Sequence, residues 1–94
     1  MNGAFTTRER EIIRLICERN LCDKELAQTL GIEYGTVVLH KGNIYRKLRD
    51  RLGCQEINRI DLALYGLLAG YADTGKLRVK YAIPDERMAA AAPL

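Results

Sequence analysis

Apolar residues recur with a helical period in the first part of the chain, and the first such stretch opens with a capping signal. Thr6 stands where an N-cap residue would accept a backbone hydrogen bond, and Glu9 follows at the position that completes a capping box. Behind them, apolar residues return every three or four positions, as on a helix with one buried face: Ile12, Ile13, Leu15, Ile16 and Cys17. Asn20 tolerates a left-handed backbone, so we expect this helix to end there.

Two more helices are predicted on either side of a tight turn. The first of them covers about residues 23–30 and is closed by Gly31, a residue suited to the left-handed position after a helix. The second spans about residues 34–52 and stops at Gly53. Its apolar positions are seven and four residues apart and therefore share one face: Val37, Ile44 and Leu48. Two helices joined in this way form a helix-turn-helix pattern.

A fourth helix is expected over about residues 58–69, with an N-cap at Asn58 and Gly70 after its end. It carries two apolar stripes. We expect one stripe to dock on the other helices: Ile60, Ala63, Leu64, Leu67 and Leu68. The other would then lie on the surface, and a stripe that stays apolar there predicts a dimer interface, in which the glycine permits close approach. This predicted dimer interface comprises Leu62, Tyr65, Gly66 and Ala69.

The pattern changes after the fourth helix. A turn at Asp73–Gly75 precedes three apolar residues that alternate with basic ones, as in a short strand: Leu77, Val79 and Tyr81. From Pro84 onward we expect the chain to fray. The sequence therefore predicts an all-α fold, in which residues 1–70 form a four-helix domain. Residues 71–94 are expected to form a short C-terminal extension, extended in conformation and partly ordered at best.

Length and composition restrict the kind of protein. The 94 residues have room for one compact domain, and no apolar run approaches the roughly 18 residues of a membrane span. The N-terminus has neither the charged segment nor the apolar segment of a secretory signal. One histidine and three cysteines without a C-x-x-C pair exclude a zinc finger, and the sequence offers no catalytic triad, carboxylate pair or phosphate loop. We expect a cytoplasmic, non-enzymatic binding domain without metal or cofactor.

Positive charge is concentrated in one part of the chain. The net charge is +3, and residues 38–59 alone carry six basic and two acidic side chains, whereas the segments on either side are close to neutral. Such a concentration is typical of a phosphate-binding surface, although a solvated helix surface gives the same pattern.

The motifs of residues 5–69, taken together, resemble the LuxR/GerE-type DNA-binding domain. The resemblance is carried by T-T-R-E-R-E-I-I-R-L-I from Thr6, K-E-L-A-Q-T-L-G-I from Lys24, G-T-V from Gly35, His40, and N-I-Y-R-K-L from Asn43. The resemblance implies a four-helix domain that inserts its third helix into the major groove of duplex DNA and forms a homodimer through its fourth helix. The expected function is that of a transcriptional regulator.

The resemblance and the charge pattern both assign the DNA contacts to the third helix. Side chains on its exposed face can reach base edges, while flanking basic groups hold phosphates. A hydroxyl near its N-terminus can donate to a phosphate together with backbone N–H groups. The predicted phosphate contacts are Thr36, Lys41, Arg46 and Lys47. The predicted groove-facing residues are Val38, Leu39, His40, Gly42 and Asn43.

The chain departs from the family pattern within this helix. Val38 stands where the family often has lysine, and Leu39 and Gly42 beside it add no hydrogen-bond donor. Apolar side chains can contact thymine methyl groups and glycine permits close backbone approach, which favours A·T-rich, partly indirect readout. The alternative is a protein-interaction module that keeps the fold but has lost operator readout. The additional turn Arg49–Leu52 places two more arginines at the far end of the helix. The segment R-K-L-R from Arg46 to Arg49 resembles region 4 of sigma factors, a further alternative.

Cysteine positions and chain length raise two more questions. Cys22 stands where the family commonly has a serine N-cap, so either Asp23 takes over the cap or the thiol acts as a redox sensor. Most family members carry a receiver or ligand-binding domain, which 94 residues cannot contain. We therefore expect an excised domain or a stand-alone regulator, for which residues 71–94 would contact a protein partner.

Overall fold

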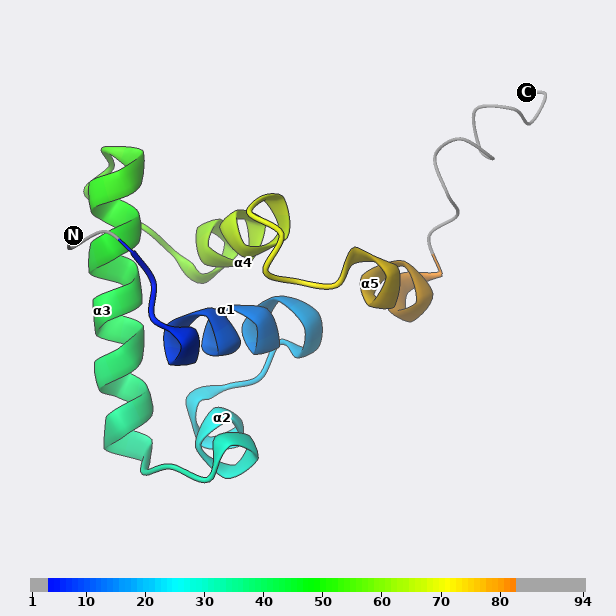
Figure 1. Ribbon diagram of the computed structural model, residues 1–94, viewed down its shortest axis with the longest axis horizontal. Coiled ribbons are helices and arrows are strands. Elements are labelled where there is room, and N and C mark those ends of the chain that lie inside the picture. The colour runs from blue at the N-terminus through cyan, green and yellow to red at the C-terminus, as the bar shows by residue number, and fades with distance from the viewer. Residues whose placement is uncertain (1–3, 83–94) are drawn as a thin grey trace.

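The structure is a computed structural model that describes residues 4–82, and over this range the chain forms five helices and no strand. Figure 1 shows α3 at one end of the molecule, α5 at the opposite end, and α1 and α4 side by side between them, with α2 beside the start of α3. None of the helices in the described range is long and apolar enough to cross a membrane. The helices are α1 (Thr7–Arg19), α2 (Asp23–Leu30), α3 (Tyr34–Leu52), α4 (Arg59–Leu68) and α5 (Thr74–Tyr81).

Capping contacts confirm the predicted start and end of α1 and the predicted start of α4. The Thr6 hydroxyl accepts from the Glu9 N–H over 3.1 Å, and the Glu9 carboxylate accepts from the Thr6 N–H over 2.9 Å. Asn58 makes the same reciprocal pair with Asp61 at the start of α4. Asn20 has the left-handed φ of 53° that was expected at the end of α1. Because these contacts satisfy backbone groups that a helix end leaves unpaired, they fix where each helix begins or ends.

Aliphatic side chains from all of the first four helices form the core. Each helix contributes the face that its periodicity predicted, except α4. Several of these side chains are fully buried: Ile12, Ile13, Leu26, Val37, Ile44, Leu48 and Leu62. Phe5, which precedes α1, closes the core with edge-on ring contacts to Tyr65 and Tyr71. Burial of this apolar surface is the main force that holds α4 on α1 and holds α1 and α2 on α3.

The prediction of which stripe of α4 faces inward is wrong. Leu62 is 0% exposed and Gly66 is buried, whereas Leu68, which was expected to dock, is 85% exposed. A Cβ at Gly66 would lie 2.6 Å from Ile13 Cγ2, so the glycine is what lets α4 approach α1 this closely. Since α4 is apolar nearly all round, its periodicity alone does not determine its orientation. The exposed apolar residues of α4, here called the α4 outer row, are Ile60, Leu64 and Leu68.

The short strand expected near Leu77 is also wrong, because residues 74–81 form a helix instead. The Asp73 carboxylate caps α5 by accepting from the N–H groups of Gly75 and Lys76, at 2.9 and 3.2 Å. A lone strand would leave its backbone groups without partners, whereas a helix pairs them internally. The fold is therefore all-helical as predicted but has five helices rather than four. The rest of the predicted extension, residues 83–94, lies outside the described range.

Candidate nucleic-acid interface

The helix-turn-helix is built by α2, a tight turn and α3. Gly31 ends α2 with a left-handed φ of 66°, and the Ile32 N–H donates back to the Ala27 carbonyl over 3.1 Å. Glu33 then caps α3 in an extended conformation, and its carbonyl accepts from the Val37 N–H over 3.2 Å. The turn thereby joins the two helices within three residues, and α3 packs against α2. One face of α3 is left uncovered by the other helices.

This uncovered face of α3 carries the predicted groove-facing residues that lack donors. Leu39 is 63% exposed and Val38 45%, and Gly42 has nothing within 4 Å of the place where a Cβ would stand. Arg46 continues the same line one turn further on and is exposed. The structure therefore brings together an outer row of α3 that is apolar at its centre and basic at one end, here called the α3 outer row: Val38, Leu39, Gly42 and Arg46.

The polar residues predicted for this interface lie beside the α3 outer row rather than on it. Thr36, His40, Lys41 and Asn43 are all half-buried. Their side chains flank the uncovered face and reach its edge. The structure thus confirms that they share α3, while their contacts with DNA stay a prediction.

Lys41, one of the predicted phosphate contacts, is engaged within the domain. Its ammonium lies 2.7 Å from the Asp23 carboxylate at the first residue of α2, and 6.0 Å from the centre of the Tyr45 ring. The pair joins the two helices of the helix-turn-helix. A phosphate would have to share this ammonium with Asp23.

Lys47, another predicted phosphate contact, is also engaged within the domain, and its contact with DNA stays a prediction. Its ammonium lies 2.6 Å from the Glu9 carboxylate and 3.0 Å from the Ala4 carbonyl, and its side chain is only 12% exposed. Burial alone would raise the pKa of Glu9, but Lys47, the Thr6 N–H and, more weakly, His40 hold that pKa below its ordinary value. Lys47 is therefore a structural cation that ties α3 to the start of α1. Sequence spacing did not reveal this because its partner lies 38 positions away.

The additional turn of α3 contacts the rest of the domain through Arg51. The Arg51 guanidinium donates to the Tyr65 hydroxyl over 3.0 Å and lies 5.0 Å from the centre of the Phe5 ring. Tyr65, predicted as a dimer contact, is half-buried in this cluster. The turn therefore braces α4 against α3.

A cavity of about 800 Å³ beside the start of α3 contains residues that sequence reasoning missed. It is lined by α2, α3 and α4 and includes the exposed Lys24 and Tyr34 next to Lys41. Arg59 borders it and donates to the Asn20 side chain and to the Leu21 carbonyl. Lys24 was visible as a basic residue in the first turn of the first helix of the motif, but its place beside α3 depends on the turn geometry.

Cys22 also lies at this cavity, and it is itself the N-cap of α2. The expectation that Asp23 takes over the cap is therefore wrong: Asp23 is the first helical residue and pairs with Lys41. The Glu25 carboxylate accepts from the Cys22 N–H over 2.9 Å. The thiol is exposed, and its redox role stays a prediction.

Comparison with known proteins accords with this geometry. The family model described as "Bacterial regulatory proteins, luxR family" matches residues 3–55, which include α1, α2 and α3. No curated protein and no solved structure gives a significant match.

Proposed function

Since the chain belongs to the luxR family of bacterial regulatory proteins, we propose that it regulates transcription by inserting α3 into the major groove of double-stranded DNA. The observation that carries this proposal is the α3 outer row, an exposed helix face that the helix-turn-helix leaves free. An α-helix fits the major groove, and its outermost side chains meet the base edges. Such a protein acts on the chromosome, so the proposal places it in the cytoplasm and gives it no enzymatic role.

Apolar contacts dominate the proposed base readout. Val38 and Leu39 are exposed at the centre of the outer row, where they can contact thymine methyl groups. Gly42 follows one turn later with open space around it, which lets the backbone approach the floor of the groove. With no donor at these three positions, we expect a preference for A·T pairs with part of the specificity carried by DNA shape.

Basic and hydroxyl groups around the row supply the proposed phosphate contacts. Arg46 is exposed at one end of the row, and Thr36 lies near the N-terminus of α3 at the other. Lys41, shared with Asp23, and the neighbouring Lys24 extend the set toward α2. His40 and Asn43 stay in the proposal as polar groups at the edge of the row. Lys47 stays a predicted phosphate contact, although a phosphate would have to share its ammonium with Glu9.

We assign the proposed dimer contact to the α4 outer row. Ile60, Leu64 and Leu68 are spaced by one helical turn and are exposed on one face. Pairing two such faces about a two-fold axis removes them from water and places two α3 helices on the same duplex. We propose residues 1–70 as this DNA-binding, dimerising unit, and a protein partner for residues 71–94 stays a prediction.

The decisive experiment is a selection from random duplex DNA with sequencing of the bound pool. We expect an enriched, A·T-leaning motif with two-fold symmetry. Arg46→Gln should weaken binding to all sequences alike and reduce the slope of log affinity against log salt by about one unit. Arg10→Gln is the matched control, since Arg10 is exposed on α1 beside Thr7 and away from α3.

The exposed Val38 and Leu39 also support the second candidate, a protein-interaction module that has lost operator readout. The same selection separates the two. A pool that stays random at physiological salt, with equal binding by the Arg46→Gln variant, contradicts the DNA-binding proposal and favours the module.

A further inference from the structure

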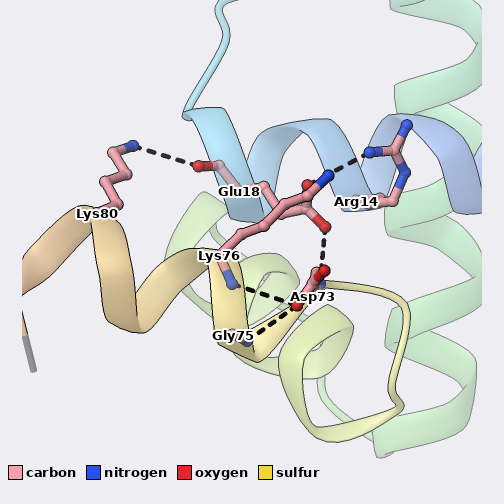
Figure 2. Close-up of polar contacts among 6 residues, drawn as sticks. All are labelled: Arg14, Glu18, Asp73, Gly75, Lys76 and Lys80. Carbon is pink, nitrogen blue, oxygen red and sulfur yellow. Dashed lines mark hydrogen bonds and ion pairs between the residues drawn. The ribbon is translucent and has the colours of Figure 1, made fainter. Parts of the chain in front are cut away.

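The fifth helix is held to α1 by polar contacts around one buried glutamate. Glu18 is 7% exposed, and its carboxylate accepts from the Asp73 N–H over 2.7 Å and pairs with Arg14 at 3.3 Å. The Glu18 carbonyl accepts from the Lys80 ammonium over 3.2 Å. Figure 2 shows these contacts between α1 and the two ends of α5. None of the residues of α5 itself is buried, so these contacts supply much of its attachment.

An open cavity of about 490 Å³ lies beside this attachment, between α1, the end of α2 and α5. Four cationic side chains line it and come from two helices that are far apart in the sequence: Arg14, Arg19, Lys76 and Lys80. Among the described residues, the acidic side chains in its lining are Glu11 and Glu18. The net charge of the described side chains that line the cavity is therefore positive.

The acidic residues of the cavity already have partners, which leaves three of its cations without an ion pair among residues 4–82, although the Arg19 charge acts on Glu25 outside the cavity. Glu11 pairs with Arg8 at 3.1 Å, and Glu18 pairs with Arg14. Lys80 donates to a neutral carbonyl and lies 5.2 Å from the centre of the Tyr81 ring. Within residues 4–82, no carboxylate lies at ion-pair distance from Arg19, Lys76 or Lys80. Three like charges around one cavity repel one another, and an anion would relieve that repulsion.

We propose that this cavity binds a compact polyanion, a small molecule that carries two or more phosphate or carboxylate groups. The volume is in the range of small-molecule sites. Arginine and lysine side chains are the usual partners of phosphate and carboxylate groups, with short charge-assisted hydrogen bonds. The cations surround a cavity rather than forming a strip, which favours a compact anion over an extended acidic polypeptide.

The position of the cavity separates it from the proposed DNA interface. Figure 1 places α5 at the end of the molecule opposite α3. The family match ends at residue 55 and does not reach α5. A duplex seated on the α3 outer row would lie on the far side of the domain from Lys76 and Lys80.

Anion binding would also hold α5 in place. The bound group bridges α1 and α5, adding a contact to a helix that otherwise depends on Glu18. Amide hydrogens of α5 should then exchange more slowly when the anion is present, because local opening becomes less frequent. This links occupancy of the cavity to the order of the segment that follows the DNA-binding unit.

The test uses the full chain with inorganic pyrophosphate and citrate as probes, measured by calorimetry at low ionic strength and by hydrogen exchange. We expect at least one of the two probes to bind. Its binding should slow the hydrogen exchange of the α5 amides. The double variant Lys76→Gln/Lys80→Gln should weaken binding roughly tenfold or more, as the loss of charge-assisted contacts predicts. Arg19→Gln changes α1 and leaves α5 intact, and it should also weaken binding of the probe. Arg10→Gln, outside the cavity, should leave that binding unchanged.

Several outcomes would overturn the proposal. Equal binding to wild type and all variants would place the anion elsewhere. Binding of a hexaglutamate peptide without binding of either probe would identify an acidic polypeptide as the ligand. Loss of duplex binding in the Lys76→Gln/Lys80→Gln variant would make the cavity a DNA contact. Arg46→Gln tests the other site independently, since it should weaken duplex binding and leave the binding of pyrophosphate unchanged.

Discussion

Glu9 serves two partners, because the same carboxylate oxygen completes the cap of α1 and pairs with the Lys47 ammonium. Both side chains are nearly buried, at 3% and 12% exposed. Removing one charge from a buried pair leaves the other without compensation, which typically costs 3–5 kcal/mol. We therefore expect Lys47→Met to lower the free energy of unfolding by about 3 kcal/mol, measured by urea denaturation. Arg46→Met, one position away and exposed, should change it by less than about 0.5 kcal/mol.

The lowered pKa of Glu9 predicts a dependence of stability on pH. Burial opposes ionisation, but Lys47 and the Thr6 N–H outweigh it and hold the pKa below its ordinary value in the folded state. The unfolded chain binds a proton more readily, so this contribution to stability is complete above about pH 4.3 and is lost as the pH falls through the folded-state pKa.

Thermal unfolding followed by circular dichroism between pH 7 and pH 3 checks this dependence. The stability difference between wild type and Glu9→Gln should be largest near neutrality and should shrink below about pH 4.3. The same comparison in a Lys47→Met background should depend much less on pH. A constant difference across the range would show that Glu9 is not the group that titrates.

Two mid-helix glycines give a matched test of how α4 is oriented. A Cβ at Gly66 would stand 2.6 Å from Ile13 Cγ2, a methyl on a β-branched and fully buried side chain, whereas Gly42 on α3 has open space around it. Replacing glycine by alanine inside a helix gains up to about 1 kcal/mol, and overpacking a core costs about 1–3 kcal/mol. Gly42→Ala should therefore stabilise the domain and Gly66→Ala should destabilise it, by urea denaturation. Stabilisation by both would contradict the close contact between α4 and α1.

The elements that the sequence predicts well are those with local signals. The boundaries of α2 and α3 agree with the predicted ranges of 23–30 and 34–52, because the glycines after each helix and the apolar spacing within them are read from neighbouring residues. The strand near Leu77 was wrong because two alternations in a short segment do not outweigh an Asp73 cap that starts a helix.

The orientation of α4 and the partners of the α3 lysines could not be predicted, because they depend on contacts between residues far apart in the sequence. The inward stripe of α4 was chosen from two nearly equal apolar faces, and the contact that decides between them joins Gly66 to Ile13. Lys47 belongs to the basic stretch of α3 and differs from Arg46 only in the direction that it faces. Of the candidate interface, the sequence located the helix and its exposed apolar centre, while the partners of Lys41 and Lys47 required the packing of α3 on α1 and α2.

The whole molecule separates its candidate surfaces in space. The α3 outer row faces away from the core at one end, the cationic cavity lies near α5 at the other, and the α4 outer row occupies a different helix from either. Substitutions on one surface should therefore leave the others unaffected. This separation makes the dimer proposal testable without disturbing base contacts.

The dimer prediction compares two leucines on opposite faces of α4. Leu64 is 52% exposed and belongs to the α4 outer row, whereas Leu62 is 0% exposed in the core. Leu64→Glu should leave the monomer folded but weaken dimerisation by at least about a hundredfold, since each of the two protomers loses a buried leucine worth about 1.5–3 kcal/mol and gains a charge. Leu62→Glu should instead unfold the domain, because it buries a carboxylate without a partner.

Sedimentation equilibrium, circular dichroism and binding to full and half DNA sites together check this prediction. Two α3 helices on one face of a duplex should lie about 34 Å apart, so the full site should be bound cooperatively by wild type. Leu64→Glu should lose that cooperativity and keep the wild-type affinity for a half-site. The α4 outer row is not the interface if both Leu64→Glu and Leu68→Glu still form dimers that bind the full site cooperatively. A folded and monomeric Leu62→Glu variant would contradict the orientation of α4 itself, and the stripe with Leu62 and Tyr65 would again be the candidate.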